Sequence, residues 1–313
     1  MTVVVTAAAG PLGRAVLERL IAHGTEPSLL VATDRPASGL GALEPLGVVA
    51  VASDPDDASS LDAVLDGAQT LVYVPTDRPD RRVAEATAVV GAAARAGVVW
   101  IVLVSSLAAG TAAAPDAGEL RFPEDAVTTS GLPFTVLRLG AVTEDFLPVL
   151  HQADRSNELV VAWGDGRVAS ASVEDYAEGV ARVIGASGYE GRTLELTGDT
   201  AWDGDDFVAA ATEVLGRQIT YARRTEDERP IDLDAAGLPR ERIAATLAHE
   251  TAIRDGALAS VSHELASLLG RPTTPLAEAL RIAAAREAQV TRPGGVTSSP
   301  RPTHPPQRPD QPA

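Results

Sequence analysis

Short apolar runs, rich in β-branched residues, recur along the first part of the chain and are separated by segments of helical length. The runs predict six strands, over residues 2–6, 29–33, 48–52, 70–74, 100–104 and 134–137. Because each run is apolar throughout rather than at alternate positions, both faces of the resulting sheet should be buried. Between the first two runs, residues 14–22 carry apolar side chains at helical spacing: Val16, Leu17, Leu20 and Ile21. The pattern predicts a doubly wound α/β fold, with helices on both faces of a parallel sheet.

The pattern changes after about residue 140, where longer helical segments dominate. A strand is predicted over residues 192–196, between helices over 173–184 and 202–215. Asp203 is placed to begin the second of these helices. Residues 223–286 are predicted to be mostly helical, with three prolines as interruptions. The second half of the chain should therefore build a different kind of layer from the first.

These segments divide the chain into three parts. We expect a nucleotide-binding α/β domain over residues 1–155, with a helix at 173–186 packing back on it. A smaller, mostly helical substrate lobe is expected over residues 156–288. Residues 289–313 are rich in proline and poor in apolar side chains, so they are predicted to form a disordered tail.

A glycine-containing loop follows the first predicted strand. Ala7-x-x-Gly10-x-x-Gly13 is a three-glycine dinucleotide fingerprint whose first glycine is replaced. The second glycine lets the backbone approach a pyrophosphate, and the third lets helix and strand pack closely. An alanine in the first position costs about 1 kcal/mol if its φ must be positive, which predicts a weakened loop that still binds. The predicted cofactor contacts here are Thr6, Ala9, Gly10, Pro11, Leu12 and Gly13. A small-residue turn that binds nothing remains the alternative.

The ends of the later strands carry further candidate cofactor contacts. Asp34 suits the free ribose hydroxyls of NAD, whereas its neighbour Arg35 suits the 2′-phosphate of NADP. The prediction is therefore NADP or NAD, with NADP slightly preferred. Asp54 is predicted to contact the adenine edge, and Pro75 and Ser105 to lie beside the cofactor at the same edge of the sheet. Two further acids, Asp56 and Asp57, are predicted to cap the helix that follows.

The stretch "SGLPFTVLRLGAVTEDF" at residues 130–146 resembles the NmrA-like, atypical short-chain dehydrogenase/reductase family. "DYAEGVARVI", "EGRTLELTGDTAW" and "LLGRPTTPLAEAL" are similar to its NAD(P)H:quinone oxidoreductase type 2 branch, over residues 1 to about 285. The resemblance implies a Rossmann domain, a small C-terminal lobe and a quinone placed over the nicotinamide between them. It places Leu120, Ala141 and Val142 on the substrate side. The chain departs from the family at these three positions, at Pro75-Thr76 and at Glu85-Ala86. Ser106, which follows the fifth strand at the ligand edge of the sheet, is a further candidate substrate contact, with a serine that caps a turn as the alternative.

Composition restricts the chemistry that the chain can perform. All 26 basic residues of the Lys+Arg class are arginine, so the Tyr-x-x-x-Lys pair of ordinary short-chain dehydrogenases cannot exist. With no cysteine, thiolate catalysis and disulfides are excluded. "HETAI" and "HELAS" each lack the second histidine of a zinc helix, so no metal is predicted. Quinone reduction remains open because an electron-poor ring accepts hydride directly and takes its proton from water. No individual catalytic residue is predicted.

The charge and the apolar runs exclude some partners. A formal net charge of −17 opposes nucleic-acid binding. The start of the chain has no basic segment followed by a long apolar run, and the longest apolar stretch is broken by Arg95. We expect a cytoplasmic protein whose substrate is a small aromatic or quinone molecule. No nucleic-acid or membrane partner is expected, and a homodimer is the self-association to test.

Three functions follow from these observations. The first is an NAD(P)H-dependent reductase of a quinone or quinone-like aromatic, a polyketide being one candidate. The second is a dinucleotide-sensing regulator without turnover, which the departures on the substrate side favour. The third is an NmrA-family protein of secondary metabolism that assists the coupling of quinonoid monomers, which the alanine- and arginine-rich, lysine-free composition suits.

Overall fold

A seven-stranded parallel sheet forms the centre of the larger part of the protein, here called the sheet domain. The computed structural model describes residues 1–36, 38–76, 78–110 and 117–290. The strand order is β3-β2-β1-β4-β5-β6-β8. The order reverses between β1 and β4, and ligands of such sheets bind in the crevice at that point. The strands are β1 (Val3–Val5), β2 (Leu30–Asp34), β3 (Val49–Ala52), β4 (Thr70–Tyr73), β5 (Trp100–Ser106), β6 (Phe134–Leu139) and β8 (Arg192–Leu196).

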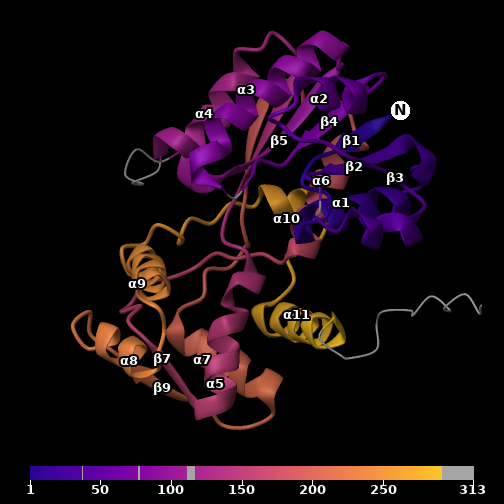
Figure 1. Ribbon diagram of the computed structural model, residues 1–313. Helices are drawn as coiled ribbons and strands as arrows, with labels where there is room; N and C mark the ends of the chain where they lie inside the picture. Colours follow the sequence, from indigo (N-terminus) through magenta and orange to yellow (C-terminus); the bar gives the residue numbers. More distant parts are fainter. Residues whose placement is uncertain (37, 77, 111–116, 291–313) are drawn as a thin grey trace, which may run out of the picture.

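Helices cover both faces of this sheet (Figure 1). One face packs on α1 (Pro11–Ala22), α6 (Val173–Ile184) and α10 (Glu264–Leu269). The other face packs on α2 (Ala58–Leu65), α3 (Pro79–Ala96) and α4 (Ala117–Thr128). Side chains of a strand alternate between faces, so Val3 and Val5 join the first core while Val4 joins the second. The predicted doubly wound α/β fold is confirmed.

A second lobe has its own core, built around aromatic side chains. The rings of Phe146 and Trp202 meet edge to face with centroids 4.8 Å apart, and Trp163 meets Phe207 at 5.6 Å. Two short parallel strands pair in this lobe, although the sequence pattern predicted neither of them. The lobe contains α5 (Leu147–Ser156), β7 (Glu158–Val161), α7 (Gly204–Leu215), β9 (Thr220–Arg223), α8 (Arg229–Ala235), α9 (Arg240–Arg254) and α11 (Leu276–Val290).

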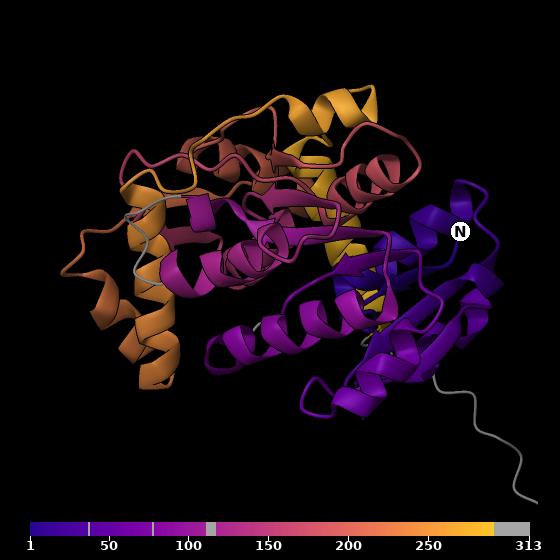
Figure 2. The ribbon, with the colours of Figure 1, turned by 90° about the horizontal axis from the view of Figure 1, so that it is seen from above.

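The chain passes between the sheet domain and the second lobe several times, which differs from the predicted division at residues 155 and 156. α5 precedes that boundary but packs in the core of the second lobe. β8 and α10 follow it but belong to the sheet domain. The physical reason is that β8 completes the hydrogen bonds of β6, and α10 covers apolar side chains of α6. Seen from above, α8 and α9 lie at the opposite end of the molecule from the N-terminus (Figure 2).

The residues predicted to cap helices are confirmed in part by the structure. Asp57 accepts the Ser59 N–H at 3.0 Å and caps α2, as predicted. Asp56 does not cap that helix, because its carboxylate instead pairs with Arg81. Asp203 begins α7, as predicted, and forms a reciprocal capping box there with Asp206. Among the described helices, none combines the length and the apolar composition needed to cross a bilayer. Residues 291–313 of the predicted tail lie outside the described part of the chain.

Candidate functional site

The loop between β1 and α1 forms a tight turn that only small residues permit. Ala7 adopts the left-handed conformation, with φ of +47°, in which a Cβ costs about 1 kcal/mol. The Gly10 N–H donates to the Ala7 carbonyl oxygen at 3.0 Å. A Cβ on Gly13 would lie 2.5 Å from that oxygen and 2.8 Å from the Cα of Ala8. Position 13 therefore requires glycine, whereas position 7 accepts alanine at an energetic cost.

The first turn of α1 presents free backbone donors. Gly10 is the N-cap and supplies no side-chain cap, and Pro11 occupies the first turn. Within the described part of the chain, the N–H groups of Leu12 and Gly13 have no backbone carbonyl partner outside their helix, as expected at a helix start. Such amides, together with the positive end of the helix dipole, bind anions. The loop therefore fits a pyrophosphate.

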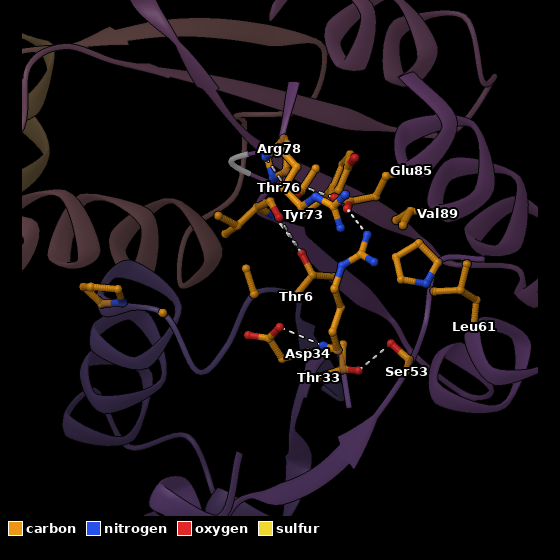
Figure 3. Close-up of a pocket in the computed structure, with 17 residues that line it drawn as sticks. Thr6, Thr33, Asp34, Ser53, Leu61, Tyr73, Thr76, Arg78, Glu85 and Val89 are labelled. Carbon is orange, nitrogen blue, oxygen red and sulfur yellow. Dashed lines mark hydrogen bonds and ion pairs between the residues drawn. The ribbon is translucent and has the colours of Figure 1, made fainter. Parts of the chain in front are cut away.

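A cavity of about 410 Å³ lies beside this loop, at the carboxyl ends of β1, β2 and β4 (Figure 3). Pro55, Leu61 and Val89 give it an apolar wall that suits a flat base. Thr33 and Ser53, whose hydroxyl oxygens lie 2.7 Å apart, contribute polar atoms. The cavity is also lined by six of the predicted cofactor contacts: Thr6, Gly10, Pro11, Asp34, Arg35 and Pro75.

Asp34 ends β2 and is held against the glycine loop. Its Oδ2 accepts the Ala9 N–H at 3.1 Å, and its Oδ1 accepts the Arg35 N–H at 2.7 Å. Carboxylate oxygens have further lone pairs, so both remain able to accept hydrogen bonds from ribose hydroxyls. The Ala9 N–H is thus bonded to Asp34, and its predicted contact with the cofactor stays a prediction.

The guanidinium of Arg35 pairs with carboxylates from other parts of the chain. Its Nη2 donates to Glu85 Oε2 at 3.3 Å, and its Nη1 lies 3.7 Å from Asp54 Oδ1. Glu85, on α3, is only 7% exposed, and its Oε1 accepts the Thr76 N–H at 2.8 Å. Burial raises the pKa of the Glu85 carboxyl, against the opposing effects of the Thr76 N–H and Arg35. Asp54 pairs with Arg35, and its predicted adenine contact stays a prediction.

The end of β4 is fixed against β1 through one hydroxyl. Thr6 Oγ1 accepts the Val74 N–H at 2.8 Å and lies 3.1 Å from the Val74 carbonyl oxygen, to which it donates. This contact positions Pro75 in the cavity wall. Tyr73 is fully buried, and its hydroxyl has no hydrogen-bond partner among the described residues. Burial, followed by the nearby Glu85 charge, raises the pKa of the Tyr73 phenol.

A second polar cluster lies at the ends of β5 and β6. Ser105 Oγ donates to Glu124 Oε1 at 2.6 Å, and Arg138 binds both oxygens of the same carboxylate at 2.9 and 2.7 Å. Glu124 is 5% exposed. Arg138 thus holds an acidic partner within the fold. The Ser105 hydroxyl is already committed as a donor, and a cofactor contact there could use only its lone pairs.

The predicted substrate-side residues are not gathered around the described cavity. Ser106 Oγ accepts the Ala108 N–H at 3.2 Å and so caps the turn after β5. The Ala141 carbonyl accepts the Tyr176 hydroxyl at 2.9 Å, and Val142 pairs with Ala171 where the chain crosses into the second lobe. The side chain of Leu120 lies outside the described residues. The substrate contacts of these four residues stay predictions.

The two histidine motifs lie in the second half of the chain, where the His249 ring packs against Phe146 and His263 is exposed. The His249 ring on α9 lies 5.6 Å from the Phe146 ring, and His263 precedes α10. Over the described ranges, no group of three or more His, Asp or Glu side chains is arranged to hold a metal ion.

Comparison with known proteins places this arrangement in a family. The NAD(P)H-binding family model matches residues 7–184. Quinone oxidoreductase 2 of Escherichia coli K12 is 34% identical over 279 residues, which cover 89% of this chain and 97% of that protein. The chain belongs to the NAD(P)H-binding family, in its NmrA-like, quinone oxidoreductase 2 branch. It is an NAD(P)H-dependent oxidoreductase of this type, so the predicted family and the predicted NADP or NAD cofactor are confirmed.

Solved structures of NAD(P)H-binding relatives share the fold over almost their whole length. The NADPH complex of the E. coli quinone oxidoreductase 2 has a TM-score of 0.82 and covers 89% of this chain and 98% of its own, at 33% identity. The Citrobacter triphenylmethane reductase in complex with NADP(H) has a TM-score of 0.83 at 27% identity, with coverage of 90% and 100%. The second lobe is therefore shared with these reductases as well as the sheet domain.

Several cavity residues of this family member were not predicted as contacts. Thr33 lies near the end of β2 and Ser53 directly follows β3, positions that the strand prediction could have flagged as part of the ligand edge. Tyr73 and Leu61 follow the pattern of core residues and gave no separate signal. Glu85 stood out only as a departure from the family, and its contact with Arg35 joins residues 50 positions apart in the sequence.

Proposed function

We propose that this chain reduces quinones, or quinone-like aromatic rings, with NAD(P)H by direct hydride transfer to the acceptor. The observation that carries the proposal is the 34% identity to the E. coli quinone oxidoreductase 2 across 97% of that protein, together with a cavity and loop that fit a dinucleotide. NAD(P)H, when bound, supplies a hydride that, with one proton from solvent, converts a quinone to a hydroquinone.

The side chains of this protein would act by binding and orienting. The amides of the Gly10–Gly13 turn would hold the pyrophosphate, and Asp34 would accept the ribose hydroxyls. Pro55, Leu61 and Val89 would pack on the adenine. No lysine is present to lower the pKa of a catalytic tyrosine, and burial raises the pKa of Tyr176 well above its ordinary value. Positioning of two rings is therefore the main catalytic device that this chain offers.

The named acceptors of its relatives have a chemical feature in common. The names of these relatives give a quinone, triphenylmethane dyes and an alkanoyl-substituted 5-oxo-2,5-dihydrofuran, all of which are conjugated systems. The last comes from the name of a Streptomyces griseus reductase that is 30% identical over 281 residues. An electron-poor conjugated carbon accepts hydride without an acid that protonates a carbonyl first. We infer that the acceptor of this chain belongs to the same electron-poor class.

Consumption of reduced nicotinamide under anaerobic conditions tests the proposal. Benzoquinones and naphthoquinones should each oxidise one NAD(P)H per hydroquinone formed, whereas unconjugated ketones should give no turnover. Gly13→Ala should abolish the reaction by distorting the loop. Tight nucleotide binding without oxidation by any acceptor would contradict the reductase function and leave the dinucleotide sensor in its place. Cytoplasmic location, homodimer formation and a role in secondary metabolism stay predictions.

A further inference from the structure

The adenosine end of the cavity carries more negative than positive charge. Glu85 and Asp54 pair with the guanidinium of Arg35, and a third carboxylate, that of Asp34, accepts the backbone N–H of the same residue. Another arginine at the rim, Arg78, has a side chain that is 55% exposed and pairs with Asp80 at 3.4 Å, so solvent screens it. A 2′-phosphate adds nearly two negative charges next to this set.

Glu85 already binds the guanidinium of Arg35, which is the cation that a 2′-phosphate would need as its partner. Arg35 Nη2 reaches from the end of β2 to Glu85 on α3, on the far side of the cavity from Asp34 (Figure 3). If Arg35 moved to a phosphate, it would leave a carboxylate that is 7% exposed without its cation, which is costly in a buried site. Ribose hydroxyls would instead bind Asp34, and the Arg35–Glu85 pair would remain intact.

We propose that Glu85 disfavours a 2′-phosphate on the bound adenosine and thereby shifts the preference of this chain from NADPH toward NADH. The proposal deepens the proposed function, since it takes NAD(P)H as the bound nucleotide, but it does not depend on which acceptor is reduced. Glu85 acts through Arg35 and is a positioning residue rather than a catalytic one. Its second contact, the Thr76 N–H at 2.8 Å, fixes the carboxylate in the orientation that meets Arg35.

The test compares dissociation constants of NADH and NADPH by calorimetric titration of the full chain, with no quinone present. The wild type should bind NADH at least as tightly as NADPH. Glu85→Gln keeps an oxygen for the Thr76 N–H and removes the charge, so it should shift the affinity ratio toward NADPH on the order of tenfold. Asp54→Asn, which removes a charge that is 41% exposed, should shift the ratio less. Glu44→Gln, at an exposed acid outside the cavity lining, should not shift it.

Two further measurements separate selectivity from a general loss of structure. Adenosine 2′,5′-bisphosphate and 5′-AMP should reproduce the same shift, because they differ only in the 2′-phosphate. Adding Arg35→Ala to Glu85→Gln should remove the gain for NADPH. An unchanged ratio in folded Glu85→Gln, or a shift toward NADH, would overturn the proposal, as would failure of the wild type to bind either nucleotide. If the wild type and the variants bound NADH and NADPH with the predicted preferences but oxidised no NAD(P)H, only the reductase function would be contradicted.

Discussion

At the scale of single residues, two positions of the nucleotide loop differ in whether they accept a Cβ. Position 7 accepts alanine, whereas position 13 requires glycine. Ala7 and Gly13 belong to the same fingerprint, and a Cβ on Gly13 would lie 2.5 Å from the Ala7 carbonyl oxygen. The sequence predicted that Ala7 would be costly if its φ were positive, and the φ of +47° meets that condition. The role of Glu85 could not be predicted, because its partner Arg35 lies 50 positions earlier and the two meet only through the fold.

Ala7→Gly should relieve the strain at the turn. Glycine adopts positive φ without the Cβ cost of about 1 kcal/mol, although its freer unfolded chain offsets part of the gain. We expect a slightly higher melting temperature and tighter NAD(P)H binding. Thermal unfolding and titration measure both, with Ala9→Gly, which lacks a positive φ, as the matched control. Unchanged affinity in Ala7→Gly would show that the alanine turn is already fully adequate.

The raised pKa of Glu85 predicts a pH-dependent effect on stability. A carboxyl whose folded pKa lies above its ordinary value of 4.5 favours folding when protonated, and that contribution is lost as pH rises through the folded pKa. Thr76, Arg35 and Tyr73 face this group. Glu85→Gln should therefore gain stability over the wild type near pH 7 and lose that gain near pH 4.5. Denaturant unfolding at both pH values measures it, and a difference independent of pH would contradict the assignment.

At the scale of elements, apolar runs predicted where strands form but not which strands become neighbours. All six early runs are strands of the sheet, and β5 and β6 extend two residues further, through Ser106 and Leu139. The strand at 192–196 was predicted, yet its pairing with β6 depends on a tertiary register that matches Leu194 to Leu137. β7 and β9 are each four residues long, too short for a periodic signal.

The start of α6 offers a prediction about an element. Ser172 Oγ accepts the Asp175 N–H at 3.1 Å, and Glu144 accepts the Val173 N–H. Ser172→Ala removes the N-cap, so it should lower the free energy of unfolding by about 1 kcal/mol. Urea denaturation measures this loss. Ser187→Ala, at an exposed site after the helix, should change stability by less than about 0.5 kcal/mol. Equal effects of the two variants would contradict the capping role.

At the scale of the whole molecule, one buried carboxylate connects the sheet domain to the chain that returns to the second lobe. Asp175 on α6 has no exposed surface. Its Oδ1 accepts Arg271 Nη2 at 2.7 Å and its Oδ2 accepts the Thr274 N–H at 2.6 Å. The predicted division placed the helix at 173–186 on the sheet domain but left β8 and α10 outside it, so the contact of Asp175 with the chain after α10 was not predicted.

Asp175→Ala should destabilise the folded protein by about 2–4 kcal/mol, because two donors lose their acceptor in a buried site. Asp175→Asn keeps one acceptor oxygen and should lose less. Calorimetric unfolding measures the difference, and nucleotide affinity should persist below the lowered melting temperature because the cavity lies elsewhere in the sheet domain. A stability loss in Asp175→Asn as large as that in Asp175→Ala would contradict this role.

The central claim is that the loop from Ala7 to Gly13 binds a dinucleotide at the start of α1. Titration of NADH and NADPH into wild type and Gly13→Ala, each shown to be folded, tests it most directly. The wild type should bind one nucleotide per chain saturably, and Gly13→Ala should lose most of that affinity, because its Cβ would lie 2.5 Å from the Ala7 oxygen. Absence of binding to the wild type, or equal binding by both proteins, would contradict the account.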